Sequence, residues 1–113
     1  MKDCLFCKII DGEIPSEKVY ESETVLAFKD INPQAPVHIL VIPKMHIESL
    51  NDVTEDNIGV VAEVMLVAKQ LAAEFNLRNG YRVVTNIGEN GGQTVHHLHF
   101  HILGGEKLTE KMC

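Results

Sequence analysis

Four of the six histidines of the chain fall within six consecutive positions, in the stretch VHHLHFHIL that runs from residue 95 to residue 103. Three of them, His97, His99 and His101, occupy every second position and alternate with apolar residues. Successive side chains of a β-strand point to opposite faces, so a strand here would carry imidazoles on one face and apolar groups on the other. The apolar face indicates packing against a core, and the imidazole face is available for chemistry.

Two kinds of chemistry fit such a row of imidazoles. Histidines two positions apart on a strand are separated by roughly 6.6 Å at the backbone, so their rings can meet around one ligand. They can hold a metal ion, or they can bind an oxyanion and supply a nucleophile. An unperturbed imidazole has a pKa of about 6.5, so its lone pair is available at neutral pH without a separate base. Attack on phosphorus would form a phospho-imidazole, which water can release.

The loop before the histidines favours phosphate chemistry. Gly91 and Gly92 allow the backbone to approach a ligand closely, and backbone N–H groups can cradle an oxyanion. Gln93 adds an amide and Thr94 a hydroxyl. A glycine loop alone is a weak signal, because loops commonly contain glycine. A glycine loop that leads directly into three alternating histidines predicts a phosphate site with a nucleophile on its floor.

The remaining sequence predicts one small domain of the α+β class with a mostly antiparallel sheet. The chain has 113 residues, of which 45% are hydrophobic and 23% charged, a globular composition. Apolar spacing and turn residues predict a short helix, a hairpin, a central strand, a long apolar helix that begins at an N-cap threonine, and two further strands. Their expected ranges are 4–11, 18–21, 24–29, 38–42, 54–76, 81–87 and 95–103.

Charge and hydropathy exclude several classes of partner. The net charge is −6 and no basic patch is present, so binding to nucleic acid is not expected. No apolar run approaches the roughly 20 residues that span a bilayer. The first ten residues, MKDCLFCKII, lack the pattern of a signal peptide. We therefore expect a cytoplasmic protein without a membrane partner.

A second constellation is the pair Cys4 and Cys7, in the spacing C-x-x-C. In a cytoplasmic protein this spacing predicts metal binding or redox chemistry rather than a structural disulfide. It supplies half of a zinc site, and histidines are available to complete a closed Cys₂His₂ set, which would be structural rather than catalytic. The alternative is two buried thiols beneath the first helix. The candidates for the two further ligands are His38, His46, His96 and His97.

The pattern H-φ-H-φ-H-φ-φ, here from His97 to Leu103, resembles the signature of the histidine-triad (HIT) superfamily. The segments CLFCKIIDGEIPSEKVYESE, LAFKDINPQAPVHILVIPKMHI and GGQTVHHLHFHILGG are similar to its Hint-like branch of nucleoside phosphoramidases and purine-nucleotide-binding proteins. The resemblance covers about residues 4 to 105. It implies that residues 1–113 form a single HIT domain, and that the protein is a homodimer whose sheets join edge to edge and whose long helices pack together.

The resemblance also implies a role for each matching position. His99 corresponds to the nucleophile, His101 to the residue at the α-phosphate and leaving group, and His97 to the outer residue that orients the site. Asp30 corresponds to the carboxylate that accepts hydrogen bonds from both ribose hydroxyls. The implied phosphate contacts are Asn86, Gly92, Gln93 and Thr94. The implied base slot consists of Leu5, Phe6, Ile9, Phe28, Lys29 and Ile31. The zinc ligands that match bacterial relatives are Cys4, Cys7, His46 and His97, which leaves His38 and His96 without a role.

These observations favour an enzyme. It would bind a purine nucleoside monophosphate moiety and hydrolyse the P–N bond of a nucleoside 5′-phosphoramidate through a covalent nucleotidyl-His99. One alternative is a nucleotide-binding regulatory or interaction module with little turnover. Others are a metal-binding protein whose histidine strand holds the ion, and a dinucleoside polyphosphate hydrolase, an activity of other branches of the superfamily.

Overall fold

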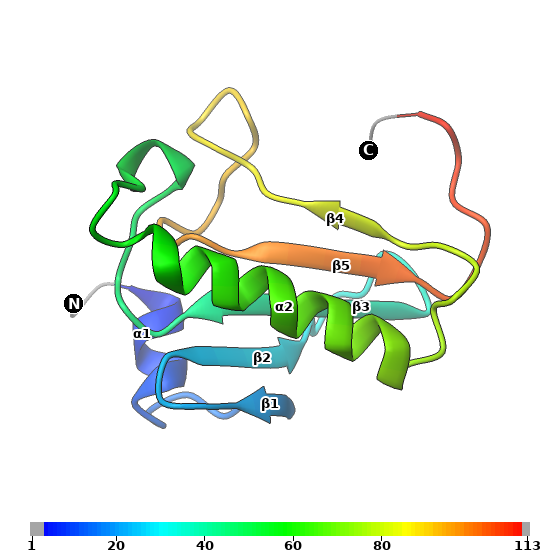
Figure 1. Ribbon diagram of the computed structural model, residues 1–113, viewed down its shortest axis with the longest axis horizontal. Coiled ribbons are helices and arrows are strands. Elements are labelled where there is room, and N and C mark those ends of the chain that lie inside the picture. Colours follow the sequence, from blue (N-terminus) through cyan, green and yellow to red (C-terminus); the bar gives the residue numbers. More distant parts are fainter. Residues whose placement is uncertain (1–3, 112–113) are drawn as a thin grey trace.

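The computed structural model describes residues 4–111, which form a five-stranded antiparallel sheet with helices on both faces (Figure 1). The strand order is β1-β2-β3-β5-β4, and every neighbouring pair is antiparallel. The predicted α+β class, with a mostly antiparallel sheet and one short and one long helix, is confirmed. The elements are α1 (Leu5–Ile10), β1 (Lys18–Glu21), β2 (Val25–Lys29), β3 (Val37–Pro43), a short 3₁₀ helix (Leu50–Asp52), α2 (Ile58–Glu74), β4 (Arg82–Val84) and β5 (Phe100–Gly104).

Strand β3 lies at the centre of the sheet and is apolar on both faces. Ile39 and Val41 belong to the core beneath α2, whereas Leu40 and Ile42 pack in a second cluster with Phe6 of α1. This two-sided burial explains why the sequence of β3 is a continuous apolar run rather than an alternating one. It also defines two faces of the sheet, which we call the α2 face and the α1 face.

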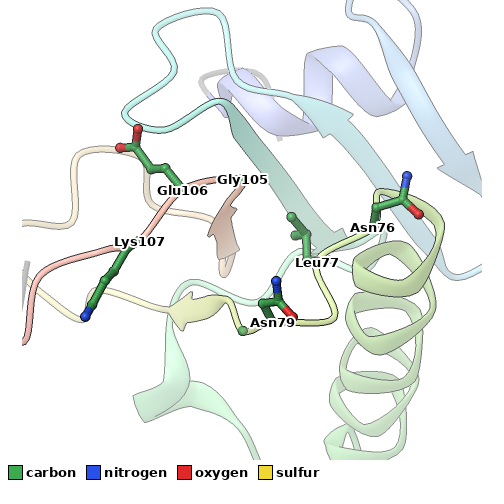
Figure 2. Close-up of a pocket in the computed structure, with 7 residues that line it drawn as sticks. Asn76, Leu77, Asn79, Gly105, Glu106 and Lys107 are labelled. Carbon is green, nitrogen blue, oxygen red and sulfur yellow. The ribbon is translucent and has the colours of Figure 1, made fainter.

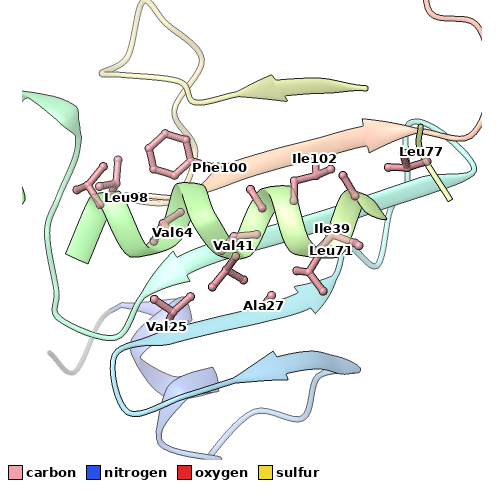
Figure 3. Close-up of a cluster of buried hydrophobic side chains, with 14 of the residues drawn as sticks. Val25, Ala27, Ile39, Val41, Val64, Leu71, Leu77, Leu98, Phe100 and Ile102 are labelled. Atoms are coloured by element: carbon pink, nitrogen blue, oxygen red, sulfur yellow. The ribbon is translucent and has the colours of Figure 1, made fainter. Parts of the chain in front are cut away.

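Helix α2 covers one face of the sheet along most of its length (Figure 3). Val64 and Leu71 have no exposed surface and contact the core that Ile39, Val41 and Ile102 build from the strands. The opposite side of α2 is also apolar but lies outside this core. There Met65 is 39% exposed and Leu66 is 68% exposed, so this apolar side of the helix is not buried within one chain.

The ends of α2 differ from the predicted range 54–76. Thr54 is not the N-cap, because residues 54–57 form a separate turn in which the Asn57 side chain accepts the Thr54 N–H (2.7 Å). At the other end Asn76 adopts a left-handed conformation with φ of 61°. The N–H of Leu77 then reaches the carbonyl of Ala72 (2.8 Å). This is a Schellman ending, in which asparagine takes the place that glycine usually occupies.

The two strands nearest the histidines are shorter than predicted. Strand β5 begins at Phe100, so the expected strand 95–103 is wrong for residues 95–99. The partner strand β3 ends at Pro43, which has no N–H, and the carbonyl of Pro43 is bound by the ring of His97 (2.8 Å). Strand β4 ends at Val84, and the hydroxyl of Thr85 then donates to the carbonyl of His99 (2.8 Å) in place of a further ladder bond.

The alternation of faces nevertheless extends through this segment. Leu98 and Phe100 belong to the core on the α2 face. His97 and His99 lie against the ring of Phe6, on the α1 face. Among residues 4–111, none of the helices has both the length and the apolar character that crossing a membrane requires.

The packing of α2 leads to a stability prediction. Leu71→Ala should lower the free energy of unfolding by about 2–5 kcal/mol, because a fully buried side chain is replaced by a cavity. Leu50→Ala is the matched control: that leucine is 46% exposed, and we expect a loss of less than about 1 kcal/mol. Urea unfolding monitored by circular dichroism measures both. Equal losses in the two variants would contradict the assigned core.

Candidate functional site

The three alternating histidines lie together on the α1 face of the sheet. His101 is part of β5 and lies opposite Leu40 of β3, while His97 and His99 immediately precede the strand. The ring centroid of His99 is 5.0 Å from that of His101 and 5.0 Å from that of Phe6, which meets it edge-on. The structure therefore gathers the predicted triad beside the short N-terminal helix.

A hydrogen bond to the backbone determines the tautomer of His99. Its Nδ1 lies 2.7 Å from the carbonyl oxygen of His97. A carbonyl oxygen only accepts, so Nδ1 carries the proton and Nε2 is left with a free lone pair. His99 is 5% exposed, and burial lowers the pKa of its imidazole, although the hydrogen bond to His97 opposes this shift. The ring is thus a neutral base or nucleophile at physiological pH.

His101 is oriented by a fourth histidine, His38. The backbone N–H of Gln34 donates to Nδ1 of His38 (3.0 Å), so the proton of the His38 ring is on Nε2. Nε2 of His38 lies 2.9 Å from Nδ1 of His101, so its N–H donates to that nitrogen. His101 therefore accepts at Nδ1 and presents an N–H at Nε2. Burial and the neighbouring His99 and His38 lower the pKa of His101 to about 4.

The role of His38 is not predicted from the sequence. A signal was nonetheless present, since His38 is the polar exception in the otherwise apolar run HILVI of the central strand. It is 7% exposed, and in that strand it alternates with Ile39 so that it faces the histidine side of the sheet. Its partner His101 is 63 positions away, which is why only the folded sheet reveals the pair.

Asp30 lies at the end of β2 beside this pair. One carboxylate oxygen is 3.4 Å from Nε2 of His38, and the other accepts the backbone N–H of Asn32 (2.8 Å). One carboxylate oxygen of Asp30 and one ring nitrogen each of His38 and His101 lie within 4.8 Å of one another. Asp30 therefore acts as a turn residue, and its carboxylate also reaches the histidine site.

A cavity of about 500 Å³ opens beside His101. Asn86, Gly91 and Gly92 line it together with His101 and His38, so the structure brings the predicted asparagine and the glycine loop to the histidines. The loop needs its glycines. A Cβ on Gly91 would overlap the carbonyl oxygen of Ile87, and Gly92 has a φ of 82°.

Gln93 and Thr94 are placed differently. Gln93 is buried, and its side chain accepts the N–H of Gly88 (2.9 Å) and donates to the carbonyls of Glu48 (2.7 Å) and Val95 (3.0 Å). These bonds make Gln93 the residue that holds the glycine loop in shape. Thr94 is exposed at the end of the loop. Their roles as phosphate contacts stay predictions.

The residues of the predicted base slot divide into a buried floor and an open rim. Phe6 and Phe28 meet edge-on with ring centroids 5.6 Å apart, and Ile9 packs in the same cluster. Leu5 is 44% exposed and Ile31 is 90% exposed. Lys29 is also exposed, and pairs with Glu17 (2.8 Å). The exposed members are available to a ligand, and the buried members serve the core at the same time.

Cys4, Cys7, His46 and His97 converge on one point between α1 and the end of β3. Nδ1 of His97 is 3.3 Å from Sγ of Cys4, 3.5 Å from Sγ of Cys7 and 3.2 Å from Nδ1 of His46. Sγ of Cys7 is 3.3 Å from Nδ1 of His46. Four ligand atoms around a tetrahedral Zn²⁺ at bond lengths of about 2.0–2.3 Å lie about 3.3–3.8 Å from one another. This cluster, the Cys–His cluster, is positioned to bind a metal ion.

The hydrogen bonding of His97 supports the same conclusion. Its Nε2–H donates to the carbonyl of Pro43 (2.8 Å), so Nδ1 is unprotonated and faces the cluster. Metal-binding histidines usually donate their second ring N–H to such an acceptor. Burial and the neighbouring Cys4 raise the pKa of the Cys7 thiol to about 11, so a cation is needed to keep this thiol ionised at neutral pH. Of the other candidates, His96 is exposed beside Glu48 and His38 binds His101.

A second hollow, of about 480 Å³, lies at the far end of the sheet (Figure 2). It is bounded by the segment that follows α2 and by the residues that follow β5. Its lining contains neither histidine nor cysteine: the residues are Asn76, Leu77, Asn79, Gly80, Gly105, Glu106 and Lys107. This hollow therefore offers neither the imidazoles nor the thiols that form the two sites described above.

Comparison with known proteins agrees with this geometry. A family model described as "Scavenger mRNA decapping enzyme C-term binding" matches residues 3–112. A HIT-like protein of Synechococcus elongatus is 50% identical over 107 residues, which are 95% of this chain and 94% of that protein. The chain belongs to the histidine triad (HIT) family.

Solved structures of HIT proteins share the whole fold. A HIT family hydrolase from Clostridium thermocellum is 45% identical with a TM-score of 0.97, and the match covers 100% of this chain and 99% of that one. A histidine triad protein from Clostridium difficile is 50% identical with a TM-score of 0.94, and covers 99% and 98% respectively. The HIT fold predicted from the residues is thereby confirmed for this chain.

The burial of His101 leads to a prediction about pH. In metal-free protein its pKa of about 4 lies below the ordinary 6.5, so between these values the unfolded chain takes up a proton more readily than the folded one. The free energy of unfolding should therefore fall as the pH falls from 6.5 towards 4. His101→Asn should show a shallower fall. The remainder comes from His97, whose pKa burial lowers to about 4, and from His99 and His38, whose pKa values burial also lowers. Urea unfolding at several pH values measures the slopes. Identical slopes in both proteins would contradict the assignment.

Proposed function

We propose that this protein is a hydrolase that cleaves the P–N bond of purine nucleoside 5′-phosphoramidates through a nucleotidyl-histidine intermediate. The observation that carries the proposal is the unprotonated Nε2 of His99. The carbonyl of His97 holds the ring proton on Nδ1, and the ring of His99 lies 5.0 Å from that of His101, which lines the cavity. Membership of the HIT family and likeness to a solved HIT family hydrolase support hydrolysis in general.

In the first step the lone pair on Nε2 of His99 attacks phosphorus, a P–Nε2 bond forms, and the bond from phosphorus to the leaving nitrogen breaks. The leaving nitrogen takes a proton from Nε2 of His101. His101 is neutral in the free protein, but the negative charge of a bound phosphoryl group favours its protonated form. In the free protein the hydrogen bond from His38 orients the ring of His101. When Nδ1 of His101 takes up the second proton it can no longer accept that bond, and Nε2–H of His38 can donate instead to the carboxylate of Asp30, 3.4 Å away.

In the second step water replaces the histidine. A water molecule gives a proton to the now neutral His101 and attacks phosphorus, and the P–Nε2 bond breaks with its electrons returning to His99. The result is a free amine, a nucleoside monophosphate and the original protein. Two displacements through a reactive phospho-imidazole replace one difficult displacement by water.

The rest of the site suits a nucleotide. The carboxylate of Asp30 lies near His38 and His101, where it could accept hydrogen bonds from a ribose diol. The exposed side chains of Leu5 and Ile31 offer apolar surface to a purine above the buried ring of Phe6. Asn86 and the backbone of Gly92 line the cavity at His101, where they can bind phosphoryl oxygens.

Replacement of the nucleophile tests the mechanism. His99→Ala should lower kcat for an adenosine phosphoramidate at least about 10⁴-fold, since covalent catalysis is lost. His96→Ala is the matched control and should leave kcat unchanged, because His96 is exposed and outside the site. Release of the amine measures turnover. Full turnover by His99→Ala would contradict the mechanism, and tight nucleotide binding without turnover by the unmodified protein would favour a binding module.

We further propose that the Cys–His cluster holds a structural zinc ion. The four ligands form a closed set with tetrahedral spacing, and the cluster ties α1 to the end of β3. When bound, zinc would supply the positive charge that keeps both thiols ionised. A cytoplasmic location fits this proposal, because a reducing compartment keeps Cys4 and Cys7 available as ligands.

Metal analysis of purified protein tests the zinc proposal. We expect about one zinc ion per chain, and a large loss of zinc in Cys7→Ser, because a tetrahedral site would lack one ligand. His99→Ala should retain the metal, since His99 does not belong to the cluster. Zinc loss in His99→Ala with retention in Cys7→Ser would place the ion on the triad instead.

We also propose that the protein is a single-domain homodimer. The outer side of α2 exposes Ile58, Met65 and Leu66, which recur at helical spacing. Strand β4 is an edge of the sheet, and its Val83 and the adjacent Tyr81 are 42% and 41% exposed. A second copy could cover both features, with the long helices packed together and the two sheets joined at their edges.

A further inference from the structure

His97 takes part in two sites at once. The Nδ1 atom of its ring lies in the Cys–His cluster, 3.3 Å from Sγ of Cys4 and 3.2 Å from Nδ1 of His46. Its backbone carbonyl accepts the Nδ1–H of His99 at 2.7 Å. One fully buried residue thus joins the metal-binding side chains directly to the bond that determines which nitrogen of His99 can react.

The backbone carbonyl of His97 lies outside the sheet ladder. The pairing of β5 with β3 begins at Phe100, opposite Val41. Between the loop and this point, the backbone N–H of Leu98 donates to the carbonyl of Ile47 (2.6 Å), and the ring of His97 donates to Pro43 (2.8 Å). The peptide that carries the His97 carbonyl is therefore held from two directions, by the bond from the Leu98 N–H of the same peptide to Ile47 and by the side chain of His97.

The cluster also holds α1 against the nucleophile. Cys4 is the N-cap of α1, and its sulfur accepts the backbone N–H of Cys7 (3.2 Å). The same turn presents Phe6, whose ring meets His99 edge-on at 5.0 Å and His97 at 6.0 Å between centroids. The Cys–His cluster consequently restrains the ring of His99 by two routes, through the backbone of His97 and through the side chain of Phe6.

We propose that the Cys–His cluster positions the nucleophile as well as stabilising the fold. Cys4, Cys7 and His46, with a metal ion bound, hold the ring of His97, and the His97 carbonyl then keeps the proton of His99 on Nδ1. Without the metal, the His97 ring loses the restraint of the cluster and keeps its bond to Pro43, so the ring can shift within its site and its carbonyl moves with it. As far as it concerns turnover, this inference rests on the proposed hydrolase function. It makes Cys4, Cys7 and His46 positioning residues.

Nuclear magnetic resonance of protein with ¹⁵N-labelled histidine tests the proposal directly. Long-range proton–nitrogen spectra report the protonation of each ring nitrogen of His99, independently of turnover. We compare zinc-loaded protein, chelator-treated protein and His46→Asn, each checked for folding by its amide spectrum. Leu71→Ala is the control, because it destabilises the core and leaves the cluster intact.

In zinc-loaded protein we expect one tautomer of His99, protonated at Nδ1. After chelation, and in His46→Asn, a second tautomer should appear and kcat should fall about 10²-fold, the loss that a displacement of about 1 Å can cause. Added zinc should restore the chelated protein. Leu71→Ala should keep the single tautomer despite its lower stability.

A folded, zinc-free protein that keeps both the single tautomer and the full kcat would overturn the proposal and leave the cluster with a stabilising role alone. The outcome is separable from the proposed function. If the tautomer follows zinc but the unmodified protein releases no amine from a phosphoramidate, the hydrolase proposal fails and the positioning role stands.

Discussion

The hydrogen bond from Nδ1 of His99 to the backbone carbonyl of His97 determines the chemistry open to this site (2.7 Å). Because a carbonyl oxygen can only accept, the bond places the proton on Nδ1 and leaves Nε2 as a nucleophile. Burial keeps the ring neutral. A second set of bonds does the reverse for His101, since His38 donates to its Nδ1 and leaves an N–H on Nε2. Two adjacent imidazoles thereby acquire complementary roles, one as electron-pair donor and one as hydrogen-bond donor.

The sheet makes this arrangement possible because its two faces are stabilised separately. On the α2 face, apolar side chains from α2 and the strands form the main core (Figure 3). On the α1 face, a short helix and a small cluster around Phe6 and Leu40 cover part of the strands, and the imidazoles and the cavity occupy the space beside them. The alternation of histidine with leucine, phenylalanine and isoleucine places each residue type on the face that suits it.

Much of this follows from the sequence, because alternation and helical spacing are local properties. The triad, the glycine loop, the hairpin and the long helix are all predictable in this way. The start of β5 is not, since it depends on Pro43, a residue of another strand whose carbonyl binds His97. The role of His38 likewise depends on the pairing of β3 with β5. The spacing of Cys4 and Cys7 predicts half of a metal site, but only the folded chain and the family resemblance select His46 and His97 over the other histidines.

The central claim is that His99 forms a covalent bond to phosphorus, and intact-protein mass spectrometry tests it most directly. The protein is mixed with an adenosine phosphoramidate, quenched within milliseconds without acid and weighed. The account predicts a transient gain of one adenylyl group per chain, located on His99 by fragmentation and absent from His99→Ala. Steady release of the amine with no adduct at any time point, and equal release by His99→Ala, would show that water attacks directly and would contradict the account.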